Sequence, residues 1–213
     1  MYCTKLDIPV IPEDLKKEII DFVIVALEEG YTSAYNRQLE VEDQGNLNFL
    51  DGEDENLLNT GEVIGVPLSE ELQTKIRDFY KQTPHYIDEF FCDYWGCFVL
   101  KSSTSIVAPH QDDPEKRKFG LQLLIKAGGD NVKTTWYDIK EEFKNLPIIP
   151  DLSMPYHKLN PVHEEHLHEG HWYILNTSIV HSVDNLESVR IFLSGGKEGN
   201  TDSYDEVVKL FNT

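Results

Sequence analysis

Three residues in the second half of the chain have the types and spacing of a metal site. His110 and Asp112 lie two positions apart at the end of an apolar run, residues 105–109. Residues two apart on a strand point to the same side, so both side chains can contact one ion while Gln111 points away. His181 lies beside a distant apolar run and adds a second imidazole. Two imidazoles and one carboxylate suit Fe(II) and leave coordination positions open.

A cation follows this ligand set within a strand-like segment. Arg190 lies in residues 188–194, SVRIFLS, where alternation places Phe192 and Ser194 on its face. An arginine inside a strand of an acidic protein requires a carboxylate partner. The sequence leaves two interpretations open: Arg190 binds an anionic ligand next to the metal, or it is an exposed sheet-edge residue paired with a surface glutamate.

Two other polar features have more than one interpretation. Gln122 lies inside the apolar run 119–126, where a buried amide without a partner would be costly. It contacts either a bound ligand or another protein group. A short basic run follows His110 and Asp112, at Lys116, Arg117 and Lys118. It belongs either to a solvated hairpin or to the entrance of the site, where it would offset negative potential.

A second histidine cluster, HEEHLHEGH, occupies residues 163–171. If this segment were a strand, His166 and His168 would share a face, and zinc or nickel could bind there. The cluster has no carboxylate in strand register and no basic anchor around it. The other two histidines of this cluster are His163 and His171.

Short strands are expected to position the metal ligands. From residue 86 onward the chain consists of short β-branched and aromatic runs separated by turn residues, a pattern typical of sandwiches and barrels. Turn residues 184–187 separate the segment of His181 from that of Arg190, and Asn185 is expected to direct the chain into the next strand.

Helices are expected mainly before this region. Apolar spacing and terminal signals predict helices over residues 12–30 and 69–83, the second with Ser69 as its N-cap. Residues 31–66 are expected to be mostly loop, with room for an edge strand, and to help cover a substrate entrance. A short helix is predicted over 138–145 and a final one, capped by Ser203, over 203–212.

The length and composition predict one domain of 213 residues with 40% hydrophobic content. In this division, residues 1–85 supply helices and a loop that support the sheet, 86–200 form the β core, and 201–213 form the C-terminal helix. A net charge of −19 opposes binding to nucleic acid and to anionic membranes. No membrane span or signal peptide is recognisable, and three cysteines without metal spacing indicate reduced thiols, so a cytoplasmic location is expected.

The ordered motifs resemble those of a known superfamily. HxD at 110–112, HSVDN at 181–185 and RIFLS at 190–194 are similar to the motifs of iron(II)/2-oxoglutarate-dependent oxygenases. Among these enzymes, the prolyl and aspartyl/asparaginyl hydroxylase branches are the most similar, and the resemblance covers roughly residues 95–196.

This resemblance implies a mainly β fold with flanking α-helices, a double-stranded β-helix of the jelly-roll, cupin-like type. It implies that His110, Asp112 and His181 bind iron and act in catalysis through it. Arg190 would grip the distal carboxylate of 2-oxoglutarate, and Gln122 is a further candidate contact. Hairpin counting would place His181 opposite Arg190 in one sheet, whereas the family fold places their strands in facing sheets.

The function implied is hydroxylation of an amino-acid side chain, in a peptide or free, with Fe(II), 2-oxoglutarate and O2. A small molecule or peptide is the expected partner, and the sequence does not predict an oligomeric state. Two alternatives remain: a catalytically inactive metal-binding jelly-roll protein, and a cupin-type enzyme that does not use 2-oxoglutarate. The second alternative leaves Arg190 without a role.

Overall fold

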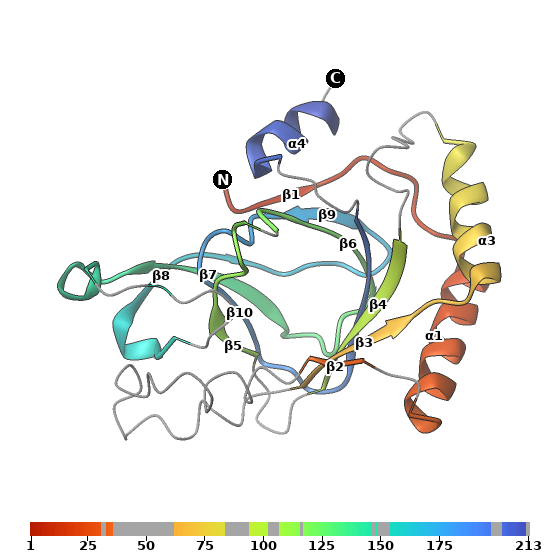
Figure 1. The fold of residues 1–213 in the computed structure, drawn as a ribbon, viewed down its shortest axis with the longest axis horizontal. Helices are drawn as coiled ribbons and strands as arrows, with labels where there is room; N and C mark the ends of the chain where they lie inside the picture. The colour runs from red at the N-terminus through yellow and green to blue at the C-terminus, as the bar shows by residue number, and fades with distance from the viewer. Residues whose placement is uncertain are drawn as a thin grey trace.

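Two antiparallel sheets form the centre of the structure (Figure 1). This computed structural model describes residues 1–30, 33–35, 62–83, 94–101, 107–115, 117–145, 148, 154–196 and 202–211. Within these ranges the larger sheet has seven strands in the order β1-β9-β6-β11-β4-β3-β2, and the smaller has four in the order β5-β10-β7-β8.

The larger sheet consists of β1 (Cys3–Lys5), β2 (Ser33–Tyr35), β3 (Glu62–Pro67), β4 (Tyr94–Lys101), β6 (Gly120–Lys126), β9 (Trp172–Leu175) and β11 (Arg190–Gly196). The smaller sheet consists of β5 (Val107–His110), β7 (Lys133–Ile139), β8 (Leu159–Glu165) and β10 (His181–Asp184). From β4 to β11 the chain passes repeatedly from one sheet to the other. This is the predicted double-stranded β-helix with flanking helices, and the fold class is confirmed.

Alternation along the strands of the larger sheet divides its apolar side chains between two cores. On β6, Leu123 and its neighbours two residues away belong to a core on the outer face of the larger sheet, under the helices. Leu124 on β6 and Phe192 on β11 point the other way, into a core shared with Trp136 of the smaller sheet. We call the face of each sheet that borders this shared core its inner face. Arg190 lies on the inner face because it alternates in phase with Phe192.

Three helices cover the outer face of the larger sheet: α1 (Glu13–Glu28), α3 (Glu70–Lys81) and α4 (Tyr204–Phe211) (Figure 1). Helix α1 buries one stripe at helical spacing, which is Leu15, Ile19, Val23 and Ala26. The predicted caps are present. The Leu72 N–H donates to Ser69 Oγ at 3.3 Å, and the Glu206 N–H donates to Ser203 Oγ at 3.4 Å.

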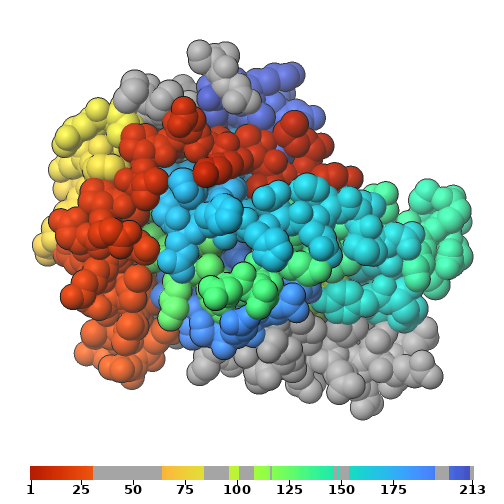
Figure 2. Space-filling model, turned by 180° about the vertical axis from the view of Figure 1, so that it is seen from behind, coloured from red at the N-terminus to blue at the C-terminus, as the bar shows by residue number. Residues whose placement is uncertain are grey.

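The N-terminal region contributes more to the sheet than its sequence indicates. Strand β1, which the sequence did not predict, pairs with β9 so that Thr4 lies opposite Ile174. Figure 2 shows the N-terminal segment, in red, lying against the residues coloured cyan that include β8 and β9. Strands β2 and β3 confirm an edge strand within residues 31–66, and the intervening residues 36–61 lie outside the described part.

One predicted helix is shorter than expected. In place of a helix over 138–145, the chain forms the 3₁₀ turn η3 (Glu141–Phe143), because β7 continues to Ile139 and takes the first residues of the segment. A second 3₁₀ turn, η4 (Tyr156–Lys158), leads into β8. None of the helices in the described ranges has the length and apolar character needed to cross a bilayer.

Candidate metal centre

The two histidines of the predicted ligand set meet at the junction of β5 and β10. His110 ends β5, His181 begins β10, and the two residues are cross-strand partners. Their ring centroids lie 4.4 Å apart with the planes tilted by 52°. Ligand atoms of His110, Asp112 and His181 lie within 4.8 Å of one another, and all three residues are buried. The structure thus brings together the three residues selected from the sequence.

The backbone fixes the orientation and tautomer of both imidazoles. Nδ1 of His110 lies 2.8 Å from the carbonyl oxygen of Ala108, and Nδ1 of His181 lies 2.9 Å from that of Ile179. A carbonyl oxygen can only accept, so each Nδ1 carries a hydrogen, and Nε2 is the atom that a neutral ring would offer to a metal. A hydrogen bond on the second ring nitrogen is the usual support for a metal-binding histidine.

Asp112 is placed by a turn and not by the strand. Strand β5 ends at His110, two residues before the carboxylate. The Asp112 N–H donates to the carbonyl oxygen of Thr177 at 3.1 Å, and Gln111 Nε2 donates to that of Ser178 at 2.5 Å. These bonds fasten the segment after β5 to the turn before β10. Oδ1 of Asp112 lies 3.6 Å from Nε2 of His110.

This donor set fits a divalent iron ion. Two imidazole nitrogens and one carboxylate oxygen converge from a short segment on one side and from β10 on the other. Such a set occupies one face of an octahedral ion and leaves the opposite face for exchangeable ligands. The hydrogen bonds to carbonyl groups fix the orientation of each histidine ring before an ion binds.

Arg190 lies on the inner face of the other sheet. Its strand β11 lies in the larger sheet between β6 and β4, whereas His181 is in the smaller sheet, so the facing arrangement expected from the family fold is present and hairpin counting was wrong. Arg190 is 3% exposed, which excludes an exposed sheet-edge residue. Burial lowers the pKa of Arg190 to about 10, with Tyr173 acting in the opposite direction. The guanidinium is therefore still charged at neutral pH.

No carboxylate within the described ranges pairs with Arg190, and its Nε atom is buried without a hydrogen-bond partner. A buried charge left in this state is destabilising, and an anion that reaches it gains a strong charge-assisted bond.

Other polar groups lie on the inner faces of the two sheets. Gln122 is 8% exposed and lies opposite both Ser194 on β11 and Tyr173 on β9. The Tyr173 hydroxyl accepts a hydrogen bond from the His168 N–H at 2.9 Å. On the smaller sheet, the buried Oγ1 of Thr134 has no hydrogen-bond partner within the described ranges. The sequence reasoning missed Tyr173 and Thr134, and of the two only Thr134 could have been indicated, by its strand phase relative to Trp136.

The second histidine cluster does not assemble a metal site. His163 stacks on Tyr2 with ring centroids 5.1 Å apart, and Nδ1 of His166 contacts the carbonyl oxygen of Val132 at 3.1 Å. Among the residues that the structure describes, three potential metal ligands come together at His110, Asp112 and His181. None of the histidines of the second cluster belongs to that group. Stacking and backbone contacts thus account for His163 and His166.

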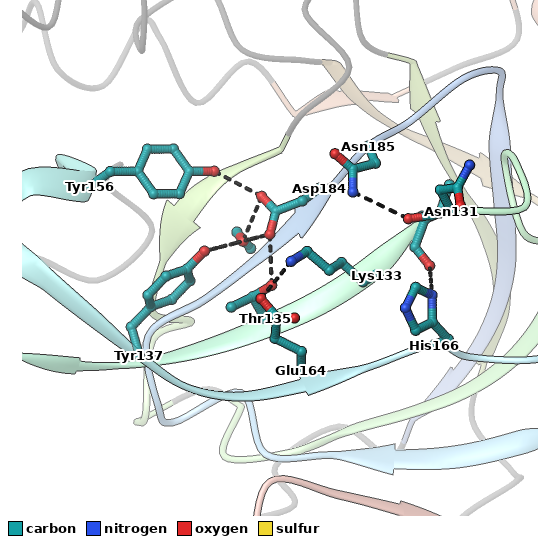
Figure 3. Close-up of polar contacts among 11 residues, drawn as sticks. Asn131, Lys133, Thr135, Tyr137, Tyr156, Glu164, His166, Asp184 and Asn185 are labelled. Carbon is teal, nitrogen blue, oxygen red and sulfur yellow. Dashed lines mark hydrogen bonds and ion pairs between the residues drawn. The ribbon is translucent and has the colours of Figure 1, made fainter.

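A polar network on the outer face of the smaller sheet holds β10 in place (Figure 3). The Asp184 carboxylate accepts hydrogen bonds from Thr135 Oγ1 at 2.7 Å, from the Tyr156 hydroxyl at 2.9 Å and from Ser182 Oγ at 3.0 Å. Desolvation by burial raises the pKa of Tyr156, so its hydroxyl stays a donor. The network fastens the strand of His181 to β7 and to η4.

Comparison with solved structures supports the fold. A Pseudomonas putida prolyl-4-hydroxylase aligns over 92% of this chain and 92% of its own, with 12% identity and a TM-score of 0.50. SnoN, a non-heme alpha-ketoglutarate-dependent epimerase from nogalamycin biosynthesis, aligns over 91% of this chain and 76% of its own, with 10% identity and a TM-score of 0.50. E. coli ycfD aligns over 70% of this chain, with 16% identity and a TM-score of 0.40, and the chain covers 36% of its length.

Neither the protein-family models nor the curated proteins contain a match to this sequence. The similarity to known proteins therefore rests on structure alone. At 10–12% sequence identity it shows a shared fold. The chain has the jelly-roll fold found in iron(II)/2-oxoglutarate oxygenases, so the resemblance read from the motifs is confirmed for the fold.

Proposed function

We propose that this protein is an iron(II)- and 2-oxoglutarate-dependent oxygenase that hydroxylates an amino-acid side chain, in a peptide or in a free amino acid. The observation that carries the proposal is the pairing of two inner-face features. A buried His-Asp-His group lies on the smaller sheet, and a buried arginine without a carboxylate partner in the described ranges lies on the larger sheet. The fold shared with a prolyl hydroxylase supports it.

Iron, 2-oxoglutarate and O2, when bound together, supply the oxidising power needed to hydroxylate a C–H bond. The residues of this chain supply geometry and electrostatics. His110 and His181 offer Nε2 lone pairs and Asp112 offers a carboxylate oxygen. No side chain is required to act as a general acid or base.

Arg190 is proposed to bind the carboxylate of 2-oxoglutarate that is remote from the metal. A guanidinium matches a carboxylate with two parallel hydrogen bonds, and burial strengthens this interaction. Tyr173, Thr134 and Gln122 lie on the same inner faces and are further candidate contacts. The surrounding core residues Leu124 and Trp136 are buried and apolar, which limits access of water.

The proposal is tested by measuring succinate formed from 2-oxoglutarate by the purified protein with Fe(II) in air. We expect iron-dependent succinate formation that falls strongly in Arg190→Ala. The control is Lys133→Ala, which removes a cation that pairs with Glu164 at the surface. Iron binding without succinate formation would favour the inactive metal-binding alternative. Succinate formation that is unchanged in Arg190→Ala would contradict the role of Arg190.

The substrate is sought by mass spectrometry. Free amino acids and a peptide library are incubated with the loaded protein, and products heavier by one oxygen atom are identified. A peptide or amino acid that gains oxygen only in the presence of 2-oxoglutarate would establish the substrate class. Oxygen gained only by molecules of another class would contradict the amino-acid hydroxylase proposal and leave the oxygenase proposal in place.

A further inference from the structure

Arg117 makes a close contact with one of the proposed metal ligands. Its Nε lies 2.8 Å from Oδ2 of Asp112, and its Nη2 contacts the same oxygen. The Asp112 side chain is 4% exposed and that of Arg117 is 40% exposed. A guanidinium that is open to solvent on one side thus grips a buried carboxylate on the other.

The backbone prepares this contact. The Arg117 N–H donates to the carbonyl oxygen of Asp113 at 2.7 Å, which closes a turn directly after Asp112. The turn begins with Asp113, whose Oδ1 accepts a hydrogen bond from the Glu115 N–H at 3.0 Å. Thr177 joins both ends, because its carbonyl oxygen accepts from the Asp112 N–H at 3.1 Å and its hydroxyl donates to the Arg117 carbonyl oxygen at 3.5 Å.

The two carboxylate oxygens of Asp112 therefore have different surroundings. Arg117 contacts Oδ2 through two donors, whereas Oδ1 is the atom 3.6 Å from Nε2 of His110. A carboxylate with both oxygens available can bind a metal through both and occupy an extra position. A planar guanidinium holding one oxygen fixes the rotation of the carboxylate and favours coordination by the other.

We propose that Arg117 is a positioning residue that presents Oδ1 of Asp112 to the metal and keeps Oδ2 from coordinating. This inference rests on the proposed metal site. Arg117 thereby acts directly on the ligand Asp112. The sequence had indicated only that Arg117 belongs to a solvated hairpin or to a basic entrance of the site. Lysine would keep the charge but not the two-donor geometry.

The test measures Co(II) binding in the absence of O2, by titration and by the visible spectrum of the bound ion. We expect Arg117→Ala to weaken Co(II) binding about 10- to 100-fold, the usual effect of removing an outer-shell partner. Its spectrum should also change, because a carboxylate released from Arg117 can bind through both oxygens. Arg117→Lys should fall between the wild type and Arg117→Ala. Lys126→Ala, which removes an exposed cation from the end of β6, should bind as the wild type does.

Added guanidinium separates positioning from a general structural role. Because the Arg117 side chain is partly exposed, its removal leaves a site that guanidinium can enter from solvent. Guanidinium well below denaturing concentrations should restore both the affinity and the spectrum of Arg117→Ala, whereas sodium at equal ionic strength should not. Circular dichroism of each variant checks the fold.

Unchanged or tighter Co(II) binding by folded Arg117→Ala would overturn the positioning role and indicate that Arg117 competes with the metal. Absence of Co(II) binding by the wild-type protein would instead overturn the metal site on which the proposed function depends.

Discussion

His110 and His181 are cross-strand partners whose ring centroids lie 4.4 Å apart, and each donates its Nδ1 hydrogen to a carbonyl oxygen two residues earlier in the chain. The same local device therefore aims both Nε2 atoms, one from the end of β5 and one from the start of β10. His110 and His181 are distant in sequence, yet they supply two of the three proposed metal ligands because their strands are adjacent in the smaller sheet.

Replacing either histidine should abolish metal binding. Loss of a group that only hydrogen-bonds to a metal ligand weakens metal binding by up to about 100-fold. His181→Ala and His110→Ala each remove a ligand itself, so we expect a larger loss of Co(II) affinity. Calorimetric titration measures this effect. His166→Ala is the matched control, since its Nδ1 also contacts a backbone carbonyl but it belongs to no ligand group. Folded His110→Ala and His181→Ala variants that keep the wild-type Co(II) affinity would show that the metal binds elsewhere.

Replacing Arg190 should affect the cosubstrate and not the metal. Truncating one partner of a buried charged pair costs about 2–5 kcal/mol, so Arg190→Ala should raise the KM for 2-oxoglutarate by about 30-fold to several thousandfold. Co(II) affinity should stay within about threefold of the wild type, since Arg190 lies on the facing sheet. A variant that loses Co(II) but keeps its KM would contradict this division of roles.

The network around Asp184 should contribute to stability. Tyr156→Phe removes one donor to the Asp184 carboxylate, and we expect the free energy of unfolding to fall by about 1–2 kcal/mol. Urea denaturation measures this change. Lys133→Met, which breaks the surface pair with Glu164, should cost less than about 1 kcal/mol. A larger loss in Lys133→Met than in Tyr156→Phe would be contrary to the structure.

The buried thiol of Cys97 and the half-buried thiol of Cys3 should resist alkylation. Burial raises the pKa of Cys3 and of Cys97 to about 12. At pH 8 the thiolate fraction is then on the order of 10⁻⁴, roughly a thousandfold below that of an exposed cysteine. Mass spectrometry should find both residues unlabelled by iodoacetamide in the native protein, with labelling that increases as pH rises toward 12, and labelled in urea. Equal labelling rates in native and denatured protein would contradict the described burial.

Much of the site could be predicted because its residues interrupt regular patterns. His110 and Asp112 close an apolar run, and the alternation of β11 correctly placed Arg190 with Phe192 on the inner face. Tyr173 could not be selected, because all four residues of β9 are apolar or aromatic and buried, and such a strand carries no alternation to read.

Contacts that depend on long-range register were also hidden. Strand β1 has only three residues, and its place in the sheet comes from pairing with β9, at the other end of the chain. The contact between Arg117 and Asp112 could not be predicted from the sequence, because it requires the turn that is hydrogen-bonded to Thr177. In both cases a distant segment determines the structure, and local propensity does not report it.

The most direct test of the central claim is an anaerobic titration of the protein with Fe(II) and 2-oxoglutarate, followed by visible absorption. If His110, Asp112 and His181 hold iron while Arg190 holds the remote carboxylate, 2-oxoglutarate should chelate the metal and produce a charge-transfer band that saturates at one equivalent of iron. The band should be absent in His181→Ala. A folded wild-type protein that binds Fe(II) yet shows no such band at saturating 2-oxoglutarate would contradict the account.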